Sequence, residues 1–126
     1  MTITRSTTPS SPRLTKALRA AVSAAQDRQG LDIVVLDLKK VDAFTDYFLV
    51  CTGQNTKQIG AIADAIETAV REATGDRPTL TEGRVRSEWV IADYFSFVVH
   101  VFSRESRAFY DIEQLWANAR RHEFSS

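Results

Sequence analysis

The chain has 126 residues, of which 44% are apolar and 25% are charged, values typical of one compact globular domain. Sixteen Lys and Arg residues balance sixteen Asp and Glu residues, and zero net charge argues against an RNA-binding module, which normally holds phosphate with an excess of basic residues. The longest apolar run, Tyr47–Cys51, is far shorter than the about 20 residues of a membrane-spanning helix.

Residues 1–12 are rich in Ser and Thr and are predicted to form a flexible tail. The acid-poor stretch before Asp27 also resembles an organellar transit peptide, but the periodicity of the apolar residues that begins at Leu14 favours a helix of the domain, closed by Gly30. We predict a domain over residues 13–119, a C-terminal tail over residues 120–126, and a cytoplasmic location.

Two apolar runs rich in β-branched residues, Ile33–Leu38 and Tyr47–Thr52, predict buried strands. The connection between them is too short for a parallel crossover, so we expect antiparallel neighbours. After the second run, Asn55 and Gln58 have the spacing of a capping box, which predicts the start of a helix. Apolar residues then recur at helical spacing until Gly75, which predicts the left-handed stop.

From Thr79 to Tyr94 the pattern has a period of two, and Phe97–Phe102 is a further apolar run, so a hairpin is expected here. A last helix is predicted from Ser103 through Phe109 to Trp116, with one side docked on the domain. These elements predict an α/β fold in which a mixed β-sheet is packed with helices, in the order helix, two strands, helix, two or three strands, helix.

Candidate catalytic groups do not converge in this pattern. Cys51 is the single cysteine and closes an apolar run, which favours an inert core thiol over a nucleophile paired with His100. His100 itself is more typical of a hydrogen-bonded structural histidine.

Sites for an anion or a metal ion are also disfavoured. The turn over residues 52–56 has one glycine, so a capped turn is favoured over an anion site. Asp111 and Glu113 diverge by about 200° on a helix and cannot share one metal ion. With two histidines, too few soft ligands remain for a closed zinc site, so we predict no catalytic residue, no metal and no cofactor.

Trp89 lies among charged residues and has two interpretations, a core side chain or the anchor of a protein interface. Six ordered segments around it resemble the signature of the Iojap or ribosomal silencing factor (RsfS) family. The segments are Thr45–Gly53, Ile62–Asp64, Glu82–Gly83, Glu88–Tyr94, Val98–Phe102 and Arg107–Trp116.

The resemblance implies a nucleotidyltransferase-like fold without catalytic carboxylates, and a non-enzymatic factor that represses translation. Such a factor binds the large ribosomal subunit through a ribosomal protein, the fourteenth of the large-subunit series, and sterically blocks association with the small subunit. It also implies a homodimer when the protein is free. The alternative is a nucleotidyl- or phosphoryl-transfer enzyme on the same scaffold.

Carried over to this sequence, the resemblance implies a partner-binding surface whose acidic side chains suit a basic ribosomal protein. Its residues are Trp89, Glu82, Glu88, Asp93, Tyr110 and Arg107. One departure from the family pattern is Phe95-Ser96, which replaces a Gly-Asp turn. Because Phe95 lacks the conformational freedom of glycine, we predict a different or strained turn there, and an exposed Phe95 would enlarge the contact surface.

Overall fold

The computed structural model describes residues 14–41, 43–83 and 88–125, so the predicted tail over residues 1–12 lies outside the described residues. In chain order the elements are α1 (Lys16–Asp27), β1 (Leu31–Asp37), β2 (Tyr47–Thr52), α2 (Thr56–Thr74), β3 (Leu80–Glu82), β4 (Trp89–Asp93), β5 (Phe97–Phe102), α3 (Arg104–Tyr110), α4 (Ile112–Leu115) and β6 (Arg120–Phe124). Within these ranges no helix combines the length and the apolar character that crossing a bilayer requires.

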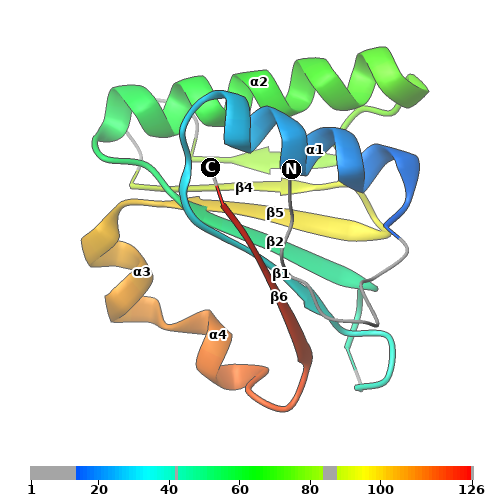
Figure 1. Cartoon of the computed structure of the whole chain (residues 1–126), viewed down its shortest axis with the longest axis vertical. Coiled ribbons are helices and arrows are strands. Elements are labelled where there is room, and N and C mark those ends of the chain that lie inside the picture. Colours follow the sequence, from blue (N-terminus) through cyan, green and yellow to red (C-terminus); the bar gives the residue numbers. More distant parts are fainter. Residues whose placement is uncertain (1–13, 42, 84–87, 126) are drawn as a thin grey trace.

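The described strands form one mixed sheet in the order β3-β4-β5-β2-β1-β6. β2 and β5 pair in parallel at its centre, and the other neighbours are antiparallel. The expected α/β fold with a mixed sheet is therefore confirmed. Helices α1 and α2 lie together on one side of the sheet, and α3 and α4 lie on the other (Figure 1).

The helices on the two faces of the sheet differ in how much of their apolar surface they bury. On the first face, α1 and α2 bury Leu18, Ile59, Ile62 and Ile66 against the strands, and each of these side chains contributes roughly 1.5 to 3 kcal/mol through burial. On the second face neither α3 nor α4 contains a buried residue. The large core thus holds α1 and α2, whereas α3 and α4 rest on a smaller cluster.

The predicted caps of α2 are confirmed. The Asn55 side chain accepts from the Gln58 amide at 2.8 Å, and the Gln58 side chain accepts from the Gln54 amide at 2.6 Å. At the other end Gly75 takes the left-handed conformation with φ of 82°. The polar turn after β2 is therefore an ordinary capped helix start, as favoured above over an anion site.

The second helix is followed by three strands, within the expected two or three: the period-two stretch holds both β3 and β4, which pair Glu82 with Ile91, while residues 84–87 lie outside the described residues. Two predicted boundaries are wrong. The last helix breaks at Asp111, which is left-handed with φ of 47°. The predicted C-terminal tail over residues 120–126 contains β6, which pairs with β1. The sequence hides β6 because Arg121 and Glu123 lie on its open face, so the strand has no apolar run.

The turn between β4 and β5 confirms the expectation for Phe95. This residue has φ of 73°, and the Ser96 amide donates to the Tyr94 carbonyl across it, which is the pattern of a γ-turn. Neighbouring groups hold the turn in place: the Asp93 carboxylate accepts from the Phe95 amide, and the Thr45 hydroxyl donates to the Phe95 carbonyl. The Phe95 ring is 81% exposed, so it gains little burial in return for its backbone conformation.

We expect Phe95→Gly to raise the free energy of unfolding by about 0.5 to 1 kcal/mol, because relief of the left-handed strain outweighs the extra freedom of glycine in the unfolded chain. Phe95→Ala is the matched control, since it removes the ring and keeps Cβ. Urea unfolding of the three proteins measures the effect, and equal stabilities of the Gly and Ala variants would contradict the strain.

Candidate functional site

A row of aromatic rings crosses the face of the sheet that carries α3 and α4. Trp89 lies opposite Phe102 in the β4–β5 ladder, and its ring stacks on the Phe102 ring with centroids 4.8 Å apart. Tyr110, the last residue of α3, also packs on the Trp89 ring, with centroids 4.6 Å apart. Trp89 is half-buried between them, so it is both a packing residue and a partly accessible ring.

The row continues in both directions from Trp89. Toward β2, the ring centroid of His100 lies 6.0 Å from that of Trp89 and 4.6 Å from that of Phe48. The Phe48 and Phe44 ring centroids are in turn 6.0 Å apart. Toward α3, Phe109 meets Tyr110 edge to face at 5.0 Å. We call this series the aromatic row; its members are Phe44, Phe48, His100, Trp89, Tyr110 and Phe109. Its two ends are open, with Phe44 72% and Phe109 80% exposed.

His100 at the centre of the row is a hydrogen-bonded structural histidine, as favoured from the sequence. The Trp89 indole donates from Nε1 to His100 Nδ1 at 3.1 Å, which requires Nδ1 to be unprotonated. Burial lowers the pKa of His100 from 6.5 to about 4, so the ring is neutral at physiological pH. A neutral, buried imidazole that holds an indole in place has a packing role.

The acidic residues predicted for the partner surface lie around Trp89 at different distances. Glu82 and Asp93 share the sheet face of Trp89, since Glu82 pairs with Ile91 and Asp93 follows Trp89 at an even spacing. Asp93 is about 13 Å along β4 from Trp89 and holds the Phe95 turn. Glu88 adjoins Trp89, and its carboxylate accepts from the hydroxyls of Ser103 and Ser106.

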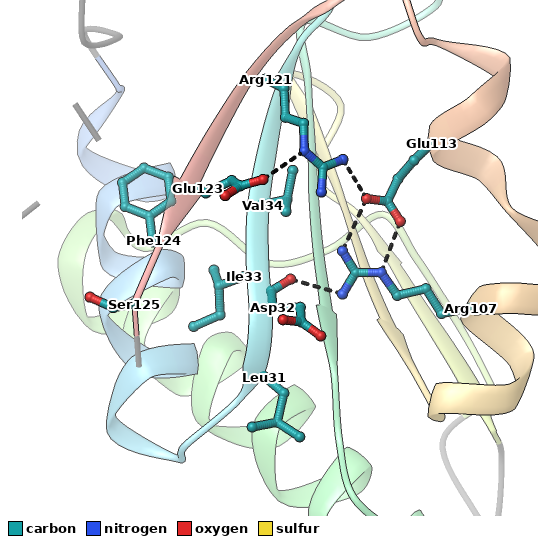
Figure 2. Close-up of a pocket in the computed structure, with 10 residues that line it drawn as sticks. All are labelled: Leu31, Asp32, Ile33, Val34, Arg107, Glu113, Arg121, Glu123, Phe124 and Ser125. Carbon is teal, nitrogen blue, oxygen red and sulfur yellow. Dashed lines mark hydrogen bonds and ion pairs between the residues drawn. The ribbon is translucent and has the colours of Figure 1, made fainter. Parts of the chain in front are cut away.

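Arg107, the remaining predicted residue, is bound within the molecule. Its Nε and Nη2 donate to the two oxygens of Glu113 at 2.8 and 3.0 Å, and its Nη1 donates to the Asp32 carbonyl. Arg121 donates to the same Glu113 carboxylate at 2.7 Å. These groups line a cavity of about 540 Å³ (Figure 2). The hydrogen bond from Arg107 is the main reason why the pKa of Glu113 is lowered.

The catalytic pair considered from the sequence does not form. Val50, the neighbour of Cys51, is opposite His100 in the parallel ladder, so the Cys51 and His100 side chains lie on opposite faces of the sheet. Burial raises the pKa of the Cys51 thiol to about 12, which suits an inert core residue. In the described ranges, no group of three or more His, Cys, Asp or Glu residues could hold a metal ion.

Sequence reasoning missed the exposure of three apolar residues, Phe109 at one end of the aromatic row, Leu115 and Leu80. Phe109 and Leu115 were expected on the docked side of one helix, but the break at Asp111 turns them outward, and Leu115 is 73% exposed. Leu80 is half exposed and shares the face of Trp89 because it pairs with Asp93. The signal for the break was weak, since aspartate tolerates the left-handed conformation without requiring it.

Comparison with known proteins gives consistent results. The family model described as "Ribosomal silencing factor during starvation" matches residues 10–126. Among curated relatives, the ribosomal silencing factor RsfS of Bacillus subtilis is 37% identical over 102 residues, covering 81% of this chain and 86% of that protein. A mouse protein named mitochondrial assembly of ribosomal large subunit protein 1 is 27% identical over 97 residues, covering 75% of this chain and 42% of the mouse protein.

Solved structures agree with the sequence matches. A crystal structure of a Chromobacterium violaceum protein has a TM-score of 0.76 and 35% identity, and the match covers 80% of this chain and 83% of that one. A Bacillus halodurans structure has a TM-score of 0.69 and 36% identity, covering 79% of this chain and 91% of that one. The expected resemblance to the Iojap and ribosomal silencing factor family is therefore confirmed.

We expect the free energy of unfolding to fall as the pH drops from 6.5 toward 4, by about 3 kcal/mol from His100 alone, because only the unfolded chain binds a proton on this ring in that window. His100→Gln keeps an acceptor for Trp89 and cannot titrate. His122, whose pKa burial also lowers, acts in both proteins, so the difference between their pH profiles isolates His100. If the free energies of unfolding of the two proteins changed with pH in parallel, the lowered pKa of His100 would be contradicted.

Proposed function

The chain belongs to the ribosomal silencing factor family, and from this premise we propose that it binds the large ribosomal subunit and blocks its association with the small subunit. The proposed contact is the ribosomal protein that is fourteenth in the large-subunit series. Blocking is steric: the bound protein occupies space that the small subunit needs. The family consists of non-enzymatic regulators of ribosomes, so translation is repressed without a chemical step.

The observation that carries this proposal is the family match over residues 10–126, which includes every element of the described fold. The name of the mouse relative also refers to the large ribosomal subunit, and this supports the large subunit as the partner. Because the bacterial relatives are ribosomal silencing factors, we place the action of this protein on ribosomes of the cytoplasm.

The aromatic row supplies the chemistry of the proposed contact. Tyr110 and the accessible part of Trp89 can anchor a partner, since aromatic side chains dominate the binding energy of many interfaces. Glu82, Glu88 and Asp93 place negative charge around these rings, which complements a basic ribosomal protein and speeds encounter. A standard interface of about 800 Å² per partner is within reach of a domain of this size.

We further propose that the free protein forms a homodimer. Phe109 and Leu115 expose most of their apolar surface on neighbouring helices, and Phe44 does so at the other end of the aromatic row. Large apolar side chains that stay exposed in this way are candidates for a protein interaction site. A second copy of the chain can bury them when no ribosome is bound.

The rival hypothesis of a nucleotidyl- or phosphoryl-transfer enzyme has no specific observation in its favour. Glu113, one of the two acidic residues considered for metal, is occupied by Arg107 and Arg121, and Asp111 is the exposed left-handed residue between α3 and α4. An RNA-binding module also remains disfavoured by the zero net charge.

We expect Tyr110→Ala to weaken association with purified large subunits by about thirtyfold, which is the loss of about 2 kcal/mol typical of a central aromatic anchor. Tyr110→Phe keeps the ring on Trp89 and is the matched control. Co-sedimentation over a range of protein concentrations measures the affinity. Trp89→Ala should weaken binding at least as much, provided that its unfolding transition shows a folded protein. Normal binding by both alanine variants would refute the anchor assignment.

At saturating concentration the parent protein should prevent purified subunits from forming joined ribosomes, because one body cannot share that surface with the small subunit. Light scattering after mixing the subunits reports joining, and Tyr110→Ala at the same concentration should restore most of it. Undisturbed joining at a concentration that saturates the large subunit would refute the steric mechanism.

A further inference from the structure

The segment that carries Tyr110 and Phe109 has little intrinsic stability. α3 has seven residues and α4 has four, and helices of this length are unstable in isolation. Neither contains a buried residue, although Ile112 and Trp116 pack partly against the second face of the sheet. Regions with few buried apolar contacts open locally at low cost. Something besides the apolar core therefore holds α3 and α4 in place.

A cluster of charged groups supplies that attachment, and we call it the clamp; its side chains are Arg107, Glu113 and Arg121. Arg107 of α3 binds both oxygens of the Glu113 carboxylate of α4, and Arg121 of β6 binds it from the other side (Figure 2). The Arg107 Nη1 also donates to the Asp32 carbonyl at 2.8 Å and to the Thr52 hydroxyl at 2.9 Å. The clamp thus joins both short helices to three strands, β1, β2 and β6 or their ends.

The geometry of the clamp gives it more weight than an ordinary surface ion pair. The side chains of Arg107 and Glu113 are only 12% and 16% exposed. The pair is bidentate, and such charge-assisted bonds fix orientation as well as distance. The lowered pKa of Glu113 agrees with a carboxylate held by two guanidinium groups. Because Nε, Nη1 and Nη2 of Arg107 all donate within the molecule, its cation is not presented to a partner.

We propose that Arg107 and Glu113 are positioning residues, whose clamp holds α3 and α4 in the pose that keeps Tyr110 on Trp89 and presents the Phe109 end of the aromatic row. This inference rests on the proposed function and deepens it: Arg107 serves partner binding through α3 rather than by contact. Without the clamp, α3 samples other positions, and only the fraction of molecules in the correct pose binds.

The test uses Glu113→Gln, which keeps the size of the side chain and removes its charge. Hydrogen exchange of the free protein should show at least tenfold faster exchange at amides bonded within 104–116, such as those of Arg107 and Asp111, while amides of β5 stay protected. If the correct pose falls to about a tenth of the population, the Kd for large subunits rises about tenfold. Arg107→Lys keeps the positive charge but cannot bind both carboxylate oxygens as a guanidinium does. It should therefore show smaller increases in exchange rate and in Kd.

Glu123→Gln is the matched control. Glu123 binds Arg121 at 3.1 Å and is 71% exposed, but it does not contact Arg107 or Glu113, so exchange over 104–116 and binding should match those of the parent. Unchanged exchange over 104–116 in Glu113→Gln would overturn the clamp, as would equal loss of protection in β5. Local loss of protection with unchanged affinity would overturn its role in binding. A parent protein that does not bind large subunits would refute the proposed function instead, and the exchange measurement would still decide whether the clamp exists.

Discussion

The parallel pairing of β2 with β5 is the constraint on which the rest of the fold depends. Every residue of both strands is buried, so both faces of the sheet must be covered at its centre. A parallel return also requires a crossover, and the chain provides it with α2, whose apolar stripe covers one face together with α1. The opposite face is left to the short helices that follow β5.

This unequal covering explains where the candidate site lies. The α1 and α2 face is closed by a large apolar core, whereas the other face keeps a row of aromatic rings whose ends reach solvent. His100 belongs both to the buried sheet and to the aromatic row. Its position in β5 buries the ring, and its Nδ1 accepts a hydrogen bond from the Trp89 indole. The same strand that completes the core therefore also orients the proposed anchor, so stability and the proposed partner binding depend on the same side chains.

The fate of the six predicted partner-binding residues shows how far single side chains can be judged from sequence. Trp89 and Tyr110 do come together, and Glu82 and Asp93 share their face of the sheet. Arg107 is drawn inward, because Glu113, Thr52 and Asp32 supply acceptors for its guanidinium from three other parts of the chain. Spacing along one helix cannot reveal such acceptors, since they lie up to 75 residues away in sequence.

Local patterns in the sequence by themselves determined α1, β1, β2, α2 and β5, the caps of α2 and the hairpin, because periodicity and capping depend on neighbouring residues. The unusual turn at Phe95 was predicted from the family resemblance, since Phe95 replaces a glycine of the family pattern. Only the tertiary structure decided the strand order, the pairing of β6 with β1, the break at Asp111 and the outward turn of Phe109 and Leu115. These depend on long-range contacts: β6 pairs with β1 although it has charged side chains, and the Arg107–Glu113 ion pair between α3 and α4 is bonded to groups of the distant strands β1, β2 and β6.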